Sequence, residues 1–177
     1  MKILTLLRHA KSDWNDPVAR DFDRPLNKRG RRAARTMGRA MRAEGLVFDA
    51  VIASPAVRVV ETLAELASGY GEEIAPTYDE RVYLASPATL IALAQTTDDG
   101  VRRLLIVGHN PGLEQLALQL TDGEETRLRA ELALKYPTAT LAEIELPIAH
   151  WGELSGSGRL TRFVRPRDLD PDLGPDS

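Results

Sequence analysis

The sequence contains no cysteine and only three histidines among its 177 residues. The absence of cysteine excludes disulfide bonds, thiolate metal sites and every mechanism that uses a cysteine nucleophile. The histidines show no HExxH motif or other spacing typical of metal ligands; they are His9, His109 and His150. The sequence therefore predicts a protein that works without a bound metal or another cofactor.

Long apolar runs and an excess of positive charge are also missing. No run approaches the roughly 18 apolar residues that a membrane-spanning helix needs, so we expect no membrane partner. The formal net charge of −3 argues against a dedicated nucleic-acid binder. The apolar start of the chain ends at Arg8 without a small-residue cleavage site, which favours a first strand over a signal peptide. We therefore expect a cytoplasmic protein.

Short apolar runs alternate with segments of helical periodicity along the chain. Strands buried on both faces of a sheet are apolar throughout, as are the runs at 3–7, 50–53 and 104–107. Helices are expected over 28–44, 57–68, 86–96 and 110–120, and the stop signals expected for the first two are Gly45 and Gly69. Alternating runs indicate later strands near one edge, at 140–146 and 159–164. The pattern predicts an α/β fold with a three-layer, doubly wound, mostly parallel sheet and helices on both faces.

One domain is expected from this organisation. With 43% hydrophobic and 28% charged residues, the chain can bury a single core, and no linker separates two cores. We assign residues 1–164 to this domain. The remaining segment, 165–177, is rich in proline and aspartate, and we expect it to fray.

Polar side chains suited to one anion follow three of the expected strands. They are Arg8 and His9 after the first strand, Ser54 and Arg58 after the second, and His109 and Asn110 after the third. Parallel strands end at one edge of a sheet, and the helices that follow aim backbone N–H groups at that edge. We therefore predict a phosphate site there, in which the arginine forks bind phosphate oxygens bidentately.

Two histidines at this edge favour phosphoryl transfer without a metal. A neutral imidazole can attack phosphorus and form a phosphoimidazole, while the other imidazole donates a hydrogen bond to the phosphoryl oxygens. Each motif alone is more typical of a strand end, a helix start or a solvated charge, and only their joint placement favours a site. His150 is expected to be structural. The arginine-rich face of 28–42 is interpreted as a solvated surface, with a docking role left open.

Four motifs occur in order between Leu6 and Gly112: LLRHAKSDW, DRPLNKRG, ASPAVRVVET and VGHNPG. They resemble the motifs of the histidine phosphatase superfamily, also called the phosphoglycerate-mutase-like superfamily. The branch that the sequence resembles most is that of the small phosphohistidine phosphatases of the SixA type. The resemblance implies a catalytic set in which His9 is the phosphorylated nucleophile and the phosphate pocket is formed by Arg8, Arg58 and His109.

Two positions depart from the family's pattern. Ala10 stands where many members have glycine, which tightens the backbone approach but should keep the site. Many members place a glutamate acid in an L-x-E pattern, and the aligned stretch TYDERVYLAS offers Glu80, with Tyr78 in place of leucine. Glu80 is thus a candidate catalytic acid, and a solvated pair with Arg81 is an equal interpretation. Asp13, which closely follows the nucleophile, is a second candidate.

The segment between 62 and 109 has no room for the large helical cap insertion that covers the site in mutases and acid phosphatases of this family. An open site admits a bulky substrate such as a protein side chain. We expect an enzyme that removes phosphoryl groups from phosphohistidine on signalling proteins and releases inorganic phosphate. A broad phosphatase of small phosphomonoesters is the alternative. A non-catalytic phosphoprotein-binding module is a third hypothesis, against which the retained histidines argue; the oligomeric state stays open.

Overall fold

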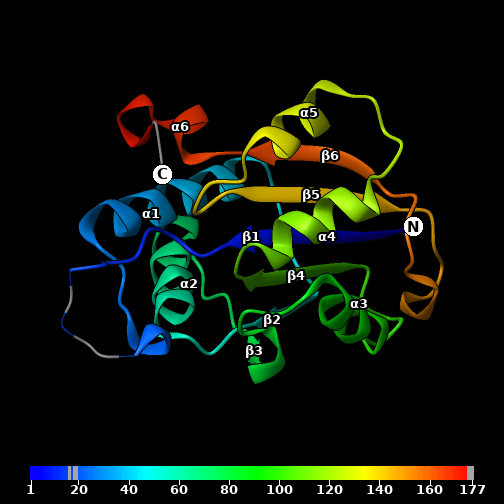
Figure 1. The fold of residues 1–177 in the computed structure, drawn as a ribbon, viewed down its shortest axis with the longest axis horizontal. Helices are drawn as coiled ribbons and strands as arrows, with labels where there is room; N and C mark the ends of the chain where they lie inside the picture. The colour runs from blue at the N-terminus through cyan, green and yellow to red at the C-terminus, as the bar shows by residue number, and fades with distance from the viewer. Residues whose placement is uncertain (16, 18–19, 175–177) are drawn as a thin grey trace.

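A computed structural model describes residues 1–15, 17 and 20–174 of the protein (Figure 1). Its centre is a six-stranded sheet with the strand order β3-β2-β4-β1-β5-β6. The strands are β1 (Lys2–Arg8), β2 (Ala50–Ala53), β3 (Thr77–Tyr78), β4 (Arg103–Gly108), β5 (Leu141–Leu146) and β6 (Arg159–Val164). The first four strands lie parallel, β5 runs antiparallel to β1, and β6 runs antiparallel to β5. The predicted mostly parallel sheet is confirmed.

Helices cover both faces of this sheet and so form three layers (Figure 1). One face is covered by α1 (Lys28–Ala43) and α2 (Val57–Tyr70), and the other by α3 (Pro87–Gln95), α4 (Gly112–Leu120) and α5 (Arg127–Leu134). Successive side chains of β4 point to opposite faces of the sheet, so the strand contributes to the core on each face. Leu104 and Ile106 pack on the side of α3 and α4. Leu105 and Val107 pack on the α1 and α2 side. The fold carries no large cap insertion, as predicted, and no helix of the described residues is both long and apolar enough to cross a membrane.

One helix stop predicted from glycine is confirmed and the other is wrong. Helix α1 ends at Ala43, and Gly45 takes a left-handed conformation with φ of 67°. Helix α2 instead runs through Gly69 and ends at Gly71, which has φ of 87°. At Gly69 the two helices approach so closely that a Cβ would overlap the carbonyl oxygen of Arg35. A glycine that the sequence offers as a break is therefore a close helix contact.

Part of the arginine-rich face of α1 is an ionic contact with α2. Arg31 pairs with Glu61 at 3.0 Å, and Arg35 pairs with Glu65 at 2.6 Å. The arginine side chains remain partly exposed, with 36% and 41% of their side-chain surface accessible. The interpretation of this face as purely solvated is therefore incomplete, because two of its arginines join the helices that cover one face of the sheet.

The segment after β6 folds onto the domain, so the prediction of a frayed tail is wrong for its described part. It forms α6 (Pro166–Leu169) and a 3-10 turn over Pro171–Leu173. Leu173 is buried in one apolar cluster with Ala10, and Asp170 pairs with Arg32 of α1. Burial of this leucine offsets part of the entropy lost on ordering, a contribution that composition alone does not reveal. Residues 175–177 lie outside the described part of the chain.

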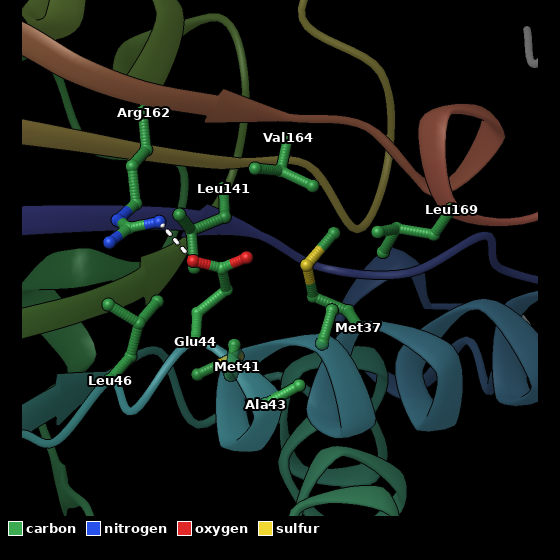
Figure 2. A pocket seen from close by; sticks show the side chains of 10 residues that line it. Met37, Met41, Ala43, Glu44, Leu46, Leu141, Arg162, Val164 and Leu169 are labelled. Carbon is green, nitrogen blue, oxygen red and sulfur yellow. Dashed lines mark hydrogen bonds and ion pairs between the residues drawn. The ribbon is translucent and has the colours of Figure 1, made fainter.

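The same segment helps to line an apolar cavity of about 240 Å³. Figure 2 shows that Met37 of α1 lies opposite Val164 of β6 and Leu169 of α6. The ion pair between Arg162 and Glu44 borders the cavity, with a nitrogen–oxygen distance of 2.8 Å. No residue that lines this cavity lies at the carboxyl ends of β1, β2 and β4, where the site expected from the sequence is found.

Candidate active site

The carboxyl ends of the parallel strands border a polar cavity of about 290 Å³. Five residues singled out from the sequence line it: Arg8, His9, Arg58, His109 and Asn110. The outer wall includes Lys11, Ser12, Trp14, Asp21 and Arg24. The structure thus brings together residues that are far apart in the chain, as the strand-end argument requires.

The hydrogen bonds of His9 determine which of its ring nitrogens can react. Nδ1 lies 2.7 Å from the carbonyl oxygen of Ala10, and because a carbonyl oxygen only accepts, Nδ1 carries the proton. Nε2 keeps its lone pair and accepts from Nε of Arg58 at 3.4 Å. Burial, together with the charges of Arg58 and Arg8, holds the pKa of His9 well below its ordinary value, although the bond to Ala10 acts in the opposite direction. His9 is therefore a neutral imidazole whose free nitrogen points at Arg58.

His109 is held with the opposite ring nitrogen protonated. An arginine only donates, so Nδ1 is the acceptor for Nη2 of Arg58, 3.2 Å away. Nε2 then carries the proton and donates to Oγ of Ser54 at 2.8 Å. Burial and the positive charge of Arg58 lower the pKa of His109 to about 3. The expected donation to phosphoryl oxygens requires a proton on Nδ1, which the Ser54 hydroxyl allows because it can donate to Nε2 as well as accept.

Ser54 was expected to bind phosphate, but it lies behind His109. Its side chain is fully buried and does not line the cavity. Oγ also accepts from the backbone N–H of Ala56 at 3.2 Å. In this structure Ser54 therefore positions the ring of His109 and does not face the space where a phosphoryl group would bind.

Asn110 and Arg8 are anchored on one backbone oxygen. The amide of Asn110 donates to the carbonyl of Tyr136 at 3.0 Å, and Nη1 of Arg8 donates to the same oxygen at 2.9 Å. The side-chain oxygen of Asn110 accepts from the backbone N–H of Glu114 at 3.1 Å and so stabilises the first turn of α4. Asn110 lines the cavity, as expected, while its polar atoms hold the helix and the loop at Tyr136.

Sequence reasoning missed a carboxylate in the cavity, that of Asp21. Oδ2 accepts from Nη2 of Arg58 at 3.0 Å, and the backbone carbonyl accepts from Nη1 at 2.8 Å. Oδ2 also accepts from the hydroxyl of Tyr83 at 2.5 Å, and Oδ1 accepts from Nε of Arg24 at 3.1 Å. Partial burial alone would raise the pKa of Asp21, but the hydrogen bond from Tyr83 and the charge of Arg58 outweigh it and lower the pKa to about 2. Asp21 is therefore an ionised anchor for Arg58.

Known proteins share both the motifs and the fold of this site. A model of the histidine phosphatase superfamily (branch 1) matches residues 4–82, which contain Arg8, His9 and Arg58. An uncharacterised protein from Mycobacterium tuberculosis is 37% identical over 164 residues, which cover 91% of this chain and 100% of that protein.

The chain belongs to the histidine phosphatase superfamily.

Solved structures place this histidine phosphatase in the SixA-type branch. The SixA protein from Agrobacterium tumefaciens matches with a TM-score of 0.76 and 29% identity, over 93% of this chain and 98% of that chain. The SixA protein from Nakamurella multipartitia matches with a TM-score of 0.77 and 26% identity, over 93% and 96%. A 2,3-bisphosphoglycerate-dependent phosphoglycerate mutase from Xanthobacter autotrophicus is 35% identical over only 43% of this chain and 38% of the mutase. Membership in the superfamily supports phosphatase activity.

Glu80, the first candidate acid of this histidine phosphatase, lies outside the cavity that His9 lines. It sits in the 3-10 turn Glu80–Val82, is exposed, and lines a neighbouring cavity with Tyr83. The alternative interpretation, a pair with Arg81, is wrong, because Arg81 pairs with Asp79 at 2.7 Å. The role of Glu80 as an acid stays a prediction.

Asp13, the second candidate acid, is engaged within its own loop. Oδ1 accepts from the backbone N–H of Asn15 at 2.8 Å, and the backbone N–H of Asp13 donates to the carbonyl of Pro25. Asp13 is not among the residues that line the cavity of His9. The structure therefore brings neither predicted acid to the nucleophile.

Metal-ligating side chains do not cluster in the described part of the chain, where no group of three or more could hold an ion. His150 lies outside the cavity and pairs with Asp99 at 3.0 Å. The next residue, Trp151, is buried and donates from its indole nitrogen to the carbonyl of Val101 at 2.8 Å. These contacts hold the connection after β5 against the start of β4.

The protonation of the two active-site histidines can be observed by NMR. Because burial lowers both pKa values, neither ring should gain a proton as the pH falls from about 8 to about 6, through the ordinary histidine value. Nitrogen-15 spectra should show His9 protonated at Nδ1 and His109 protonated at Nε2, with signals assigned through His9→Gln and His109→Gln variants. Titration of either ring near pH 6.5 would contradict this arrangement.

Proposed function

We propose that this protein hydrolyses phosphohistidine on cytoplasmic signalling proteins through a phosphoryl group carried by His9, without a metal ion. One observation carries the proposal: His9 is neutral and protonated at Nδ1, and its Nε2 lone pair points at Arg58. A neutral imidazole nitrogen beside guanidinium donors is suited to accept a phosphoryl group.

The first step transfers the phosphoryl group to the enzyme. Nε2 of His9 forms a bond to phosphorus while the bond between phosphorus and the leaving nitrogen breaks, and the electron pair of that bond stays on the leaving nitrogen. Arg8 and Arg58 neutralise the phosphoryl oxygens. Because Nδ1 keeps its proton on the carbonyl of Ala10, the phosphorylated ring of His9 carries a positive charge.

The second step releases inorganic phosphate. Water attacks phosphorus, the bond to Nε2 breaks, and its electron pair returns to His9, which becomes neutral again. The hydrogen atoms of the water leave with the phosphate. The phosphorylated ring of His9 is cationic and becomes a neutral imidazole when the bond to phosphorus breaks. It therefore needs no proton from another residue.

The leaving group determines which substrates suit this site. An alkoxide needs a proton as the P–O bond breaks, so hydrolysis of alkyl esters depends on a positioned acid. The carboxyl group held at Arg58 is that of Asp21, whose pKa of about 2 leaves it without a proton at neutral pH. A phosphohistidine with a proton on its second ring nitrogen leaves as neutral imidazole. This difference supports phosphohistidine as the substrate.

Two further observations support a protein substrate. No large insertion covers the cavity in the described part of the chain, and Trp14, which lines it, is 75% exposed. The SixA neighbours from Agrobacterium tumefaciens and Nakamurella multipartitia carry the name phosphohistidine phosphatase. An open cavity admits a side chain that projects from a folded partner.

The test compares hydrolysis of phosphohistidine, phosphoserine and a sugar phosphate by the purified protein, with and without a chelator. We expect kcat/KM to be highest for phosphohistidine and unaffected by the chelator. A native preference for a small alkyl phosphate would replace the proposal with a broad phosphatase of small phosphomonoesters. Binding of a phosphoprotein without turnover would indicate a binding module. Activity lost with the chelator and restored by Mg²⁺ or Zn²⁺ would refute metal independence.

A Glu80→Gln variant tests the remaining candidate acid. If Glu80 donates a proton, the variant should slow alkyl phosphomonoesters by roughly 100-fold, the usual contribution of a positioned general acid. Phosphohistidine and an aryl phosphate with an acidic phenol should slow far less, because their leaving groups need little protonation. Steady-state kinetics on the three substrates measure this. Equal slowing of all three would remove Glu80 from the acid role, and Asp13→Asn would then be measured in the same way.

A further inference from the structure

Asp21 lies at the end of Arg58 that is remote from the nucleophile. The guanidinium group of Arg58 donates from Nε to Nε2 of His9, and from Nη2 to Oδ2 of Asp21. A phosphoryl group that leaves by in-line displacement has the nucleophile on one side and the leaving group on the other. Asp21 therefore lies beyond Arg58 as seen from the nucleophile, among the residues that line the cavity. We place the leaving group on this side of the cavity.

The cavity wall is rich in cations. Among the described residues that line it, Asp21 has the single carboxylate. The cations are Arg8, Lys11, Arg24 and Arg58. They favour the phosphoryl dianion but disfavour a positively charged leaving group. Asp21 is 43% exposed at its side chain, so it offers a negative charge that a substrate can reach. A protonated leaving group in this cavity would find its counter-charge at Asp21.

Substrate binding would free an acceptor on Asp21. In the structure Oδ2 accepts from Arg58 and from Tyr83, and Oδ1 accepts from Arg24. Phosphoryl oxygens compete for the Nη donors of Arg58, because an arginine fork matches them bidentately. When those donors turn to the phosphoryl group, Oδ2 loses one of its hydrogen bonds. A donor on the leaving group can then take that place.

We propose that the Asp21 carboxylate accepts a hydrogen bond from the ring N–H of the leaving imidazole and thereby selects P–N over P–O substrates. The inference rests on the function proposed above and names the residue that discriminates. Asp21 holds the proton on the second ring nitrogen of the bound phosphohistidine. As Nε2 of His9 bonds to phosphorus, the P–N bond breaks and its electron pair stays on the leaving nitrogen. The product is a neutral imidazole that keeps its own proton, so no proton crosses the site.

A phosphate ester gains nothing from this contact. A serine or sugar oxygen that leaves has no hydrogen to donate, and the negative charge growing on it is repelled by an ionised carboxylate. The low pKa of Asp21, about 2, is consistent with this role, since it keeps the side chain from acting as a proton donor at neutral pH. The same residue therefore favours one leaving group and disfavours the other.

The experiment compares Asp21→Asn with the unmutated protein on two substrate classes. Phosphohistidine and phosphoimidazole have a P–N bond and a ring N–H on the leaving group, whereas 4-nitrophenyl phosphate and phosphoserine have a P–O bond. We expect kcat/KM for the P–N substrates to fall by roughly 10- to 100-fold more than for the P–O substrates, the size of a lost hydrogen bond to a charged group. Asparagine keeps the size of the side chain and an oxygen that can accept from Arg58, so the phosphate pocket should persist.

Asp23→Asn is the matched control. Asp23 lies in the same 3-10 turn and loses the same charge, but it pairs with Arg20 and does not line the cavity. Its P–N to P–O ratio should equal that of the unmutated protein. Equal losses on both classes in Asp21→Asn would mean that Asp21 only positions Arg58, and this would overturn the inference.

A measurement on the unmutated protein covers the case in which Asp21→Asn does not fold. Phosphoimidazole is compared with its N-methylated derivative, which keeps the positive charge but has no ring N–H. The enzymatic rate of each compound is divided by the rate of its spontaneous hydrolysis. This acceleration should be roughly tenfold smaller for the methylated compound. Equal enzymatic acceleration of both compounds would overturn the inference. If the unmutated protein hydrolyses 4-nitrophenyl phosphate but no P–N substrate, the proposed function itself fails, which is a different result from a ratio that Asp21→Asn leaves unchanged.

Discussion

A His9→Ala variant should lose turnover by several orders of magnitude while the protein stays folded. The nucleophile cannot be replaced by its neighbours, because Arg8 and Arg58 only donate hydrogen bonds and Nδ1 of His109 already accepts from Arg58. The loss should appear in kcat for every substrate, P–N or P–O, since the first transfer is common to both. Steady-state kinetics measure the loss, and circular dichroism and thermal unfolding check the fold.

The phosphorylated intermediate gives an independent measurement of the same role. Brief mixing of the unmutated protein with a labelled phosphate donor should place a phosphoryl group on His9 that is labile in acid and stable in base. His150→Ala is the matched control, because it removes the histidine that pairs with Asp99 outside the cavity. That variant should label normally, and His9→Ala should not label. A label on a hydroxyl or carboxylate side chain would refute the mechanism.

The central strands could be predicted from the sequence because their local apolar pattern and their burial in the fold agree. The apolar run at 104–107 is fully buried in β4, where both faces of the strand are covered. Helix α5 (Arg127–Leu134) was missed because its apolar residues do not gather on one face: Leu132 is its single buried residue, whereas Leu134 is 82% exposed. The two-residue strand β3 was missed because both of its residues are exposed, so no apolar pattern marks it. These elements are held by tertiary contacts that a local pattern does not contain.

The same distinction applies to the site. Arg8, His9 and His109 could be predicted because they lie at the end of a strand or directly after it, and parallel strands bring their ends together. Asp21 follows no strand, and it reaches Arg58 because the 3-10 turn Asp21–Asp23 borders the cavity. A weak local signal existed in the three-residue spacing between Asp21 and Arg24, which pair at 3.1 Å. That spacing indicates an ion pair but does not indicate which cavity it borders.

An Arg58→Ala variant should lose about 2–4 kcal/mol of transition-state stabilisation, the cost of removing a preorganised donor from a developing oxyanion. Arg58 is 2% exposed and contacts both histidines of the cavity, so its charge acts in a poorly solvated space where it is worth more than in water. The loss should appear in kcat/KM for all substrates. The affinity for vanadate, measured without a divalent metal, should fall as well.

Arg58→Lys is the control that separates charge from geometry. A lysine keeps the positive charge but cannot donate to two phosphoryl oxygens in a fixed fork, so it should recover only part of the activity. The protein should stay folded in both variants, because Tyr83 and Arg24 still hydrogen bond to Asp21. Full activity in Arg58→Lys would show that only the charge matters. Full activity in Arg58→Ala would remove this arginine from the phosphate pocket, and with it the reason why Asp21 lies beside the leaving group.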